Sequence, residues 1–243
     1  GNNESPLPLA GVKVLDFMWA LAGPGATRTL ADFGATVIRV ESSSRLDVIR
    51  TIRPFIDSDE SSEKSALFHN TNAGKRLLNL DLTKPEGKEV VLDLVRWCDV
   101  VTESFSPKAM KAFGLDYKSL REINPNLIML STCLFGQTGP LSMFAGYGNL
   151  AAAIAGFYAI TGWPDRDPAG PFGAYTDYIA PRYNAAAILA ALDYRDRGGE
   201  GQHIDLAQAE SALHFLTPAI LDYMANDHVQ LRQGNSDPYC APH

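Results

Sequence analysis

The first 41 residues alternate between apolar runs and a helical segment, and this order constrains the fold more than any other feature. Residues 12–17 (VKVLDF) are typical of a buried parallel strand. Residues 26–33 have helical spacing and end at Gly34, and residues 36–40 (TVIRV) are typical of a second strand. Two parallel strands joined by a crossover helix form a βαβ unit. The sequence therefore predicts an α/β fold.

The same alternation continues through most of the chain. Pro218 lies inside the last expected helix, residues 206–226, and is expected to kink it. Residues 42–65 are polar and interrupted by proline, so we expect a surface loop there. We predict an open, mostly parallel, Rossmann-like sheet with helices on both faces. Its further strands are expected at residues 99–103 and 127–132, and its helices at residues 82–97, 104–114, 117–123, 146–156 and 206–226.

Glycines in the first strand-to-helix turn raise the alternative of a dinucleotide cofactor. Gly23 and Gly25 are followed by Glu41 at about the interval that NAD-binding folds use. Arg28 stands at the place of the third glycine, so only half of the fingerprint is present. An NAD-dependent oxidoreductase is therefore a disfavoured alternative.

Composition excludes several classes of partner. The net charge of -7 argues against nucleic acid and against an anionic membrane surface. No apolar run is long enough to span a membrane. The three cysteines show no C-x-x-C spacing, and the five histidines show no spacing typical of metal ligands. We expect a protein of the reducing cytoplasm that binds no metal.

One acidic residue stands out in the stretch from Gly170 to Glu210. Asp177 follows a Gly/Pro-rich segment and precedes a helix that is expected to start near Pro181. The body of that helix, residues 185–192, is almost wholly Ala, Ile and Leu, so it should be buried nearly all round. The positive end of the helix favours the ionised carboxylate, which can act as a nucleophile. The alternative is that Asp177 only caps the helix.

The sequence of this stretch indicates a family. GPFGAYTDYIA, followed by AAAILAALDYRDRGGEGQHIDLAQAESAL, resembles the family III CoA-transferases, the formyl-CoA and carnitine CoA-transferase family. In that family an Asp at the place of Asp177 attacks the acyl thioester. The resemblance implies transfer of coenzyme A from an acyl-CoA donor to a carboxylic acid, through an aspartyl anhydride and an aspartyl-CoA thioester.

The resemblance also implies a domain organisation. It covers nearly all of the chain but only about the first half of a typical member. We expect residues 6–230 to form the N-terminal part of the large Rossmann-like domain, and residues 231–243 to lead, as a linker, toward a second, small domain that this chain lacks. We also expect a homodimer.

A set of CoA-binding residues follows from the same resemblance. Lys75 and Arg76 beside a turn offer fixed donors to a phosphate, although a solvated basic turn is the alternative. The family places the adenosine end of CoA against residues 104–113, where Ala112 stands in place of a common Arg and Lys108 or Lys111 could replace that charge. The full expected set is Ala20, Leu21, Ala22, Gly74, Lys75, Arg76, Ser104, Phe105, Lys108, Lys111 and Tyr147.

Two further alternatives share this fold. Racemases and epimerases of the same fold have a His at the place of Tyr147, because proton transfer on both faces of a carbon needs two bases. Tyr147 therefore favours the transferases. The other alternative is a CoA-binding fragment without catalytic activity. The sequence identifies neither the acyl donor nor the acceptor acid.

Overall fold

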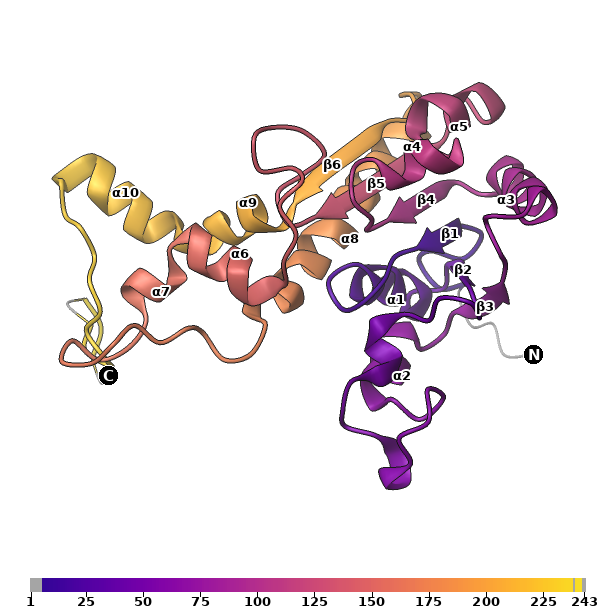
Figure 1. The fold of residues 1–243 in the computed structure, drawn as a ribbon. Coiled ribbons are helices and arrows are strands. Elements are labelled where there is room, and N and C mark those ends of the chain that lie inside the picture. The colour runs from indigo at the N-terminus through magenta and orange to yellow at the C-terminus, as the bar shows by residue number, and fades with distance from the viewer. Residues whose placement is uncertain (1–5, 238, 242–243) are drawn as a thin grey trace.

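A six-stranded sheet lies at the centre of the computed structural model, which describes residues 6–237 and 239–241 (Figure 1). The strands run in the order β3-β2-β1-β4-β5-β6, and every neighbouring pair is parallel. This confirms the predicted open, parallel α/β sheet. The strands are β1 (Lys13–Phe17), β2 (Thr36–Glu41), β3 (Arg76–Asn79), β4 (Val100–Glu103), β5 (Ile128–Cys133) and β6 (His203–Ala207).

Helices connect these strands and extend beyond them. The α-helices are α1 (Pro24–Asp32), α2 (Ala66–Asn72), α3 (Pro85–Trp97), α4 (Ala109–Phe113), α5 (Tyr117–Ile123), α6 (Gly148–Ala155), α7 (Phe157–Ile160), α8 (Tyr175–Asp196), α9 (Gln208–Leu213) and α10 (Thr217–Asn226). Three 3₁₀ turns, η1 (Val48–Thr51), η2 (Ile56–Ser58) and η3 (His214–Leu216), complete the regular elements of the described residues. No helix among them is long and apolar enough to cross a membrane.

Both faces of the sheet are covered, as its apolar strands require. Successive side chains of a strand point to opposite faces, so Val14 and Leu15 of β1 enter different cores. Val14 packs in the core that Leu30 of α1 and Ile188 of α8 share. Leu15 packs in the core formed with α3, α4 and α5. The prediction of helices on both faces is confirmed.

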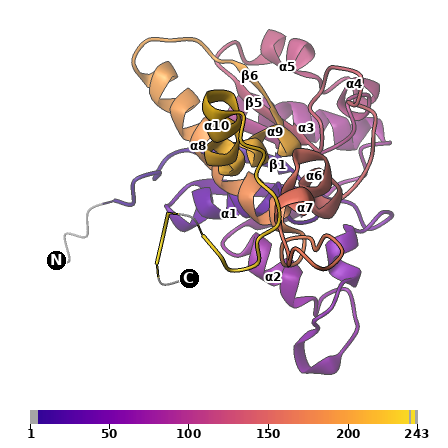
Figure 2. The same cartoon turned by 90° about the vertical axis from the view of Figure 1, so that its left-hand side faces the viewer.

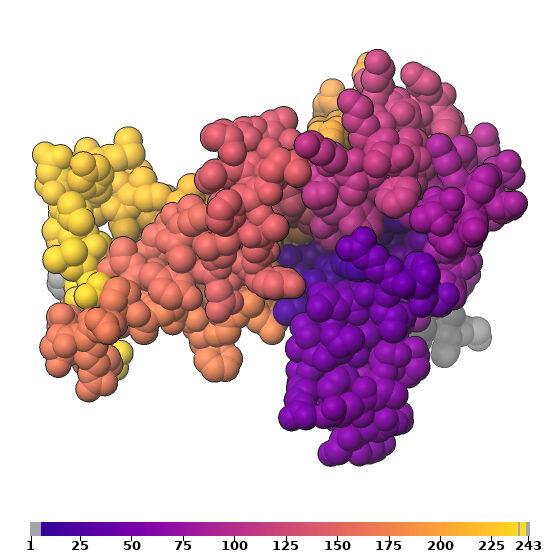
Figure 3. Space-filling model, viewed as in Figure 1, coloured from indigo at the N-terminus to yellow at the C-terminus, as the bar shows by residue number. Residues whose placement is uncertain are grey.

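Helices α6, α7, α9 and α10 form an arm beyond the carboxyl ends of β5 and β6 (Figures 1 and 2). The C-terminal half of the long helix α8 packs against the sheet, and its N-terminal half packs against the arm. Ile179 of α8 accordingly packs with Ala152, Phe157 and Ala212 in a small core of their own. In the space-filling view the arm and the lobe around α2 project on either side of a hollow (Figure 3).

Helix α8 differs from the sequence prediction in its start and in its burial. It begins at Tyr175, so Pro181 lies inside it and Asp177 lies in its first turn. The first turn is joined to α6, because the Thr176 hydroxyl donates to the carbonyl of Gly148. The helix is buried along one face only, and Leu189 on the other face is exposed.

Two other segments also differ from prediction. Residues 42–65 are more than a surface loop, because Ile49 and Arg50 in η1 are buried. Residues 206–226 are not one kinked helix. Their first two residues end the edge strand β6, and Pro218 stands in the first turn of a separate helix, α10, where its missing N–H has no helical partner to lose.

Candidate active site

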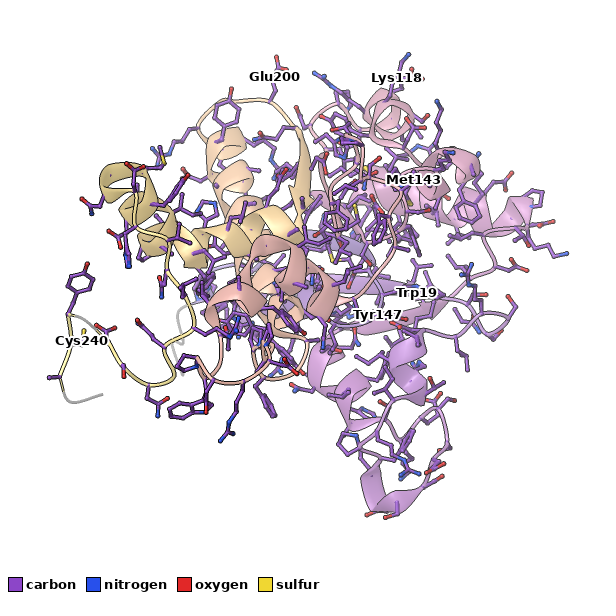
Figure 4. The ribbon with its side chains drawn as sticks, turned by 60° about the vertical axis from the view of Figure 1, so that its left-hand side comes forward. Trp19, Lys118, Met143, Tyr147, Glu200 and Cys240 are labelled. Atoms are coloured by element: carbon purple, nitrogen blue, oxygen red, sulfur yellow. The ribbon has the colours of Figure 1, made fainter. Side chains whose placement is uncertain are left out.

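A cavity of about 290 Å³ opens at the carboxyl ends of the central strands. The strand order reverses between β1 and β4, and ligands of open α/β sheets bind at such a point. Trp19 follows β1, Met143 precedes α6 and Tyr147 borders α6, and Figure 4 shows these three on the same side of the molecule. The cavity is lined by Trp19, Ala20, Leu21, Ala22, Gly23, Val48, Ile49, Ile52, Ser104, Phe105, Ser106, Pro107, Thr132, Cys133, Leu134, Ser142, Met143, Phe144, Ala145, Gly146, Tyr147, Asp177 and Gln208.

The buried Asp177 side chain lines this cavity, and its carboxylate accepts hydrogen bonds from two donors. Gln208 Nε2 donates to Asp177 Oδ1 at 2.6 Å, and the backbone N–H of Gly148 donates to Oδ2 at 3.2 Å. These donors belong to α9 and α6, whereas the N-cap position of α8 is Ala174. The carboxylate therefore does not cap its own helix, and the cap interpretation is wrong.

Burial decides the acidity of Asp177. Removal from water raises the pKa of its carboxyl group, while the hydrogen bonds from Gln208 and Gly148 lower it, and the net direction is upward. The sequence led us to expect that the helix N-terminus would favour the ionised form. In the structure desolvation outweighs the two hydrogen bonds, so the pKa of Asp177 moves in the direction opposite to that expectation. A carboxylate that is poorly solvated and oriented by two donors is suited to nucleophilic attack.

The two groups that donate to Asp177 are also linked to each other through Thr176. The Thr176 hydroxyl donates to the carbonyl of Gly148 at 2.8 Å and accepts from Gln208 Nε2 at 2.8 Å. At Gly148 there is no room for a side chain, because a Cβ there would lie 2.7 Å from Asp177 Cγ. Gly148, Thr176 and Gln208 were not predicted from the sequence, because only the fold brings α6, α8 and α9 together.

The loop after β1 forms another wall of the cavity. Ala20 adopts a left-handed conformation with φ 61°, and its N–H donates to both carboxylate oxygens of Asp47 at 3.1 Å. Arg39 pairs with the same carboxylate from the interior of the sheet. The neighbouring N–H of Trp19 donates to Ser104 Oγ at 2.8 Å, across the point where the strand order reverses.

Seven of the predicted site residues meet around this cavity. They are Ala20, Leu21, Ala22, Ser104, Phe105, Tyr147 and Asp177. That the first six contact CoA stays a prediction.

Lys75 requires a correction. Its side chain is fully buried, and Nζ donates to Asp16 Oδ2 at 2.9 Å, to the Pro24 carbonyl at 3.0 Å and to Asn72 Oδ1 at 2.9 Å. An ammonium group has three protons, and all three are used inside the protein. The structure therefore contradicts the prediction that Lys75 grips a CoA phosphate.

The other predicted cationic residues lie outside the first cavity. Arg76 is exposed on β3, at the edge of the sheet. Gly74, two residues before it, has φ +77° and does not line the first cavity either. Lys108 and Lys111 are exposed at the start and in the last turn of α4. Lys108 directly follows Pro107, which lines the first cavity.

A second cavity of about 260 Å³ shares Trp19 and Phe105 with the first. The rings of these two residues meet edge to face, with their centroids 5.9 Å apart. The guanidinium of Arg45 lies 5.5 Å from the centre of the Trp19 ring and lines the second cavity. Arg45 was not predicted as a site residue, because it lies within the segment expected to be a surface loop.

Metal binding finds no support in the described part of the chain, where no three His, Cys, Asp or Glu side chains are grouped to hold an ion.

The family model and similar relatives with a stated activity point to the same family of proteins. The family model described as CoA-transferase family III matches residues 9–243. A succinate–glutarate CoA-transferase of Agrobacterium fabrum is 42% identical over 243 residues, and a succinyl-CoA–D-citramalate CoA-transferase of Chloroflexus aurantiacus is 37% identical over 241 residues. The crystal structure of a CAIB/BAIF family protein from Brucella suis matches 98% of this chain with a TM-score of 0.90 and 39% sequence identity.

The chain spans only part of these relatives. Each of the two enzymes matches 99% of this chain, and the chain covers 60% and 59% of their lengths. It covers 63% of the Brucella suis protein.

Proposed function

The chain belongs to CoA-transferase family III, and we propose that it moves coenzyme A from an acyl-CoA donor to a carboxylic acid with Asp177 as the nucleophile. The observation that carries this proposal is the Asp177 carboxylate, which lines a cavity at the reversal of strand order and is oriented by Gln208 and Gly148. The Agrobacterium fabrum and Chloroflexus aurantiacus relatives are both named CoA-transferases. Membership of this family argues against the alternative of an NAD-dependent oxidoreductase.

The reaction begins with attack of an Asp177 oxygen on the acyl carbonyl of the donor. A C–O bond forms, the C–S bond breaks, and the thiolate of CoA leaves, so that a mixed anhydride remains on Asp177. The thiolate then attacks Cγ of Asp177, releases the donor acid and leaves an aspartyl-CoA thioester. The acceptor carboxylate takes the enzyme through the same steps in reverse. An anhydride suits this exchange because it keeps the acyl group activated.

The two cavities offer places for the two ends of CoA. We propose that the acyl group and the thioester occupy the cavity at Asp177, and that the nucleotide end lies in the second cavity. The shared side chains of Trp19 and Phe105 would contact the pantetheine arm between them. Arg45 lines the second cavity, and Lys108 lies between Pro107, which lines the first cavity, and Ala109, which lines the second. We propose these two cations as donors to the phosphate oxygens.

Short dicarboxylic acids are the first candidates for the exchanged acid, because relatives are named for succinate, glutarate and citramalate. The first cavity offers these acids a mostly apolar wall, which includes Val48, Ile52 and Met143. The lining that the described residues provide contains neither lysine nor arginine. A second carboxylate would therefore find its cation outside this lining.

The remaining expectations stand as proposals. We propose that residues 6–230 form the large-domain portion and that residues 231–243 are a linker, of which 238, 242 and 243 lie outside the described residues. Cytoplasmic location and a homodimer are proposed as well. The exposed apolar side chains of Leu221, Tyr223 and Met224 on α10 support association with another surface.

The test is covalent trapping of Asp177. Full-length protein is incubated with succinyl-CoA and glutarate, and then with a panel of mono- and dicarboxylic acids, and transfer is followed by chromatography of the CoA esters. Hydroxylamine traps the activated residue for peptide mass spectrometry. We expect the adduct on Asp177, loss of transfer in Asp177→Asn, and full transfer in Asp165→Asn, which changes an exposed carboxylate elsewhere.

Three results would overturn the proposal or part of it. Transfer by Asp177→Asn, or an adduct on another residue, would remove Asp177 as the nucleophile. Exchange of the α-hydrogen of an acyl-CoA in deuterium oxide would support a racemase instead. CoA binding by the full-length protein without any transfer would favour the non-catalytic alternative.

A further inference from the structure

We propose that the side-chain amide of Gln208 is the oxyanion donor for the reactions at the Asp177 carboxyl carbon. This role rests on the proposed aspartyl chemistry and adds a second catalytic residue to it. Gln208 lines the cavity, and its Nε2 touches the oxygen that changes charge when Cγ is attacked.

The surroundings fix the orientation of the Gln208 amide. The Thr176 hydroxyl gives its proton to the Gly148 carbonyl, so toward Gln208 it can only accept. An ionised Asp177 is also an acceptor only. The –NH₂ group therefore faces both residues, and each of its two protons has one partner. Gln208 is 6% exposed, so water competes little for either bond.

The chemistry needs a donor at this position. When the CoA thiolate attacks Cγ of the anhydride, an S–C bond forms and the π electrons of the Asp177 carbonyl move to its oxygen. When the carbonyl reforms, the bond from Cγ to the bridging anhydride oxygen breaks and the donor acid leaves with that electron pair. Gln208 keeps its proton throughout. It stabilises the oxyanion by a hydrogen bond that is in place before the reaction.

Geometry favours Gln208 over the other nearby donor. Its nitrogen lies 2.6 Å from Oδ1, whereas the Gly148 nitrogen lies 3.2 Å from Oδ2. Since the shorter bond joins Oδ1, the geometry assigns Oδ1 as the oxygen that stays on Cγ as the carbonyl. Oδ2, with the weaker bond, is then the atom that attacks the acyl group and becomes the bridging oxygen.

This assignment separates two steps of the reaction. In the first step negative charge develops on the acyl oxygen of the substrate, which Gln208 does not contact in this arrangement. In the second step negative charge develops on Oδ1, beside Gln208. Loss of the amide should therefore slow thioester formation far more than anhydride formation. A merely structural role would slow both steps together.

The experiment uses Gln208→Met in the full-length protein, because methionine keeps the length of the side chain and removes the N–H groups. Rapid quench with succinyl-CoA, followed by intact-mass spectrometry, distinguishes acylated enzyme from enzyme that carries CoA. We expect kcat to fall by about 10²–10³-fold with little change in KM, as on removal of one oxyanion donor. Acylated enzyme should accumulate at the expense of the CoA adduct.

Controls keep this inference separate from the proposed function. Ser211→Ala, on the same helix, removes a hydroxyl that bonds the Gln208 backbone carbonyl and should leave kcat unchanged. Gln208→Leu is measured in parallel, and thermal unfolding and CoA binding show which variants are folded. An equal loss of both adducts in the folded variants, or an unchanged kcat, would overturn the role of Gln208 while Asp177 remains the nucleophile. Full activity of Asp177→Asn would overturn the proposed function itself.

Discussion

Lys75 Nζ lies 2.9 Å from Asp16 Oδ2, and both side chains are fully buried beneath the loop that forms one wall of the cavity. Asp16 also accepts hydrogen bonds from Thr27 and Thr102. The pair thus connects β1, α1 and β4 with the residue directly before β3. Burial lowers the pKa of Lys75 to about 8, against the opposing attraction of Asp16. A residue that resembled a phosphate ligand in the sequence is a structural element of the interior.

Replacing Lys75 should therefore affect stability. We expect Lys75→Ala to lower the free energy of unfolding by about 3–5 kcal/mol, because it leaves the Asp16 carboxylate buried without its partner. Arg76→Ala, exposed on β3, should change it by less than about 0.5 kcal/mol. Urea unfolding measures both. A stable Lys75→Ala variant with weakened CoA binding would restore the phosphate interpretation.

Gly148 should tolerate no side chain. The Cβ of Gly148→Ala would lie 2.7 Å from Asp177 Cγ and 2.8 Å from Oδ2, so the carboxylate must move away from Gln208. Because misplacement by about 1 Å can cost roughly 10²-fold in rate, we expect kcat to fall by about that factor. Asn149→Ala, at an exposed position on the same helix, is the matched control. Steady-state rates that are equal for the two variants would contradict the contact.

The buried carboxyl group of Glu103 should make the folded state less stable as the pH rises. Burial raises the pKa of its carboxyl group to about 7 from a model-compound value of 4.5, and its Oε2 accepts from the N–H of Phe105 at 2.8 Å. Between these two values the folded state binds more protons than the unfolded state, so this group destabilises the fold progressively as the pH rises. The shift corresponds to an effect on the order of 3 kcal/mol above pH 7.

Glu103→Gln removes this titration and keeps an acceptor for Phe105. We expect the variant to gain stability over the unmodified protein as the pH rises from about 5 to about 8, with the largest difference at the upper end. Chemical denaturation at a series of pH values measures the difference. A constant difference across this range would show that Glu103 does not titrate there.

Arg45 and Lys108 should contribute to CoA affinity through its phosphates. We expect Arg45→Ala and Lys108→Ala each to weaken CoA binding by about 1.5–3 kcal/mol at low salt, as for hydrogen bonds to a charged group. Titration calorimetry with CoA and with dephospho-CoA measures the loss and shows which phosphate is held. Lys118, on α5 and apart from Trp19 and Tyr147 in Figure 4, supplies the control Lys118→Ala. Losses no larger than in this control would remove both residues from the site.

The sequence by itself determined the fold class and the family, and it singled out Asp177, the residue that we propose as the nucleophile. An apolar run such as residues 12–17 must be covered on both faces, and the run can be recognised from its own residues alone. Asp177 was identified by the residues around it, since GPFGAYTDYIA is a contiguous segment. Local pattern and family resemblance suffice where the relevant residues are neighbours in the chain.

Only the tertiary structure decided what surrounds Asp177 and where Lys75 points. Gly148 and Gln208 are 29 and 31 residues away from Asp177 in the chain, and the packing of α6, α8 and α9 brings them to its two oxygens. Lys75 and Asp16 are separated by 59 residues, and their pairing follows from the order of the strands. Hydrogen bonds and burial depend on distance in space, and sequence spacing fixes that distance only within one helix or strand.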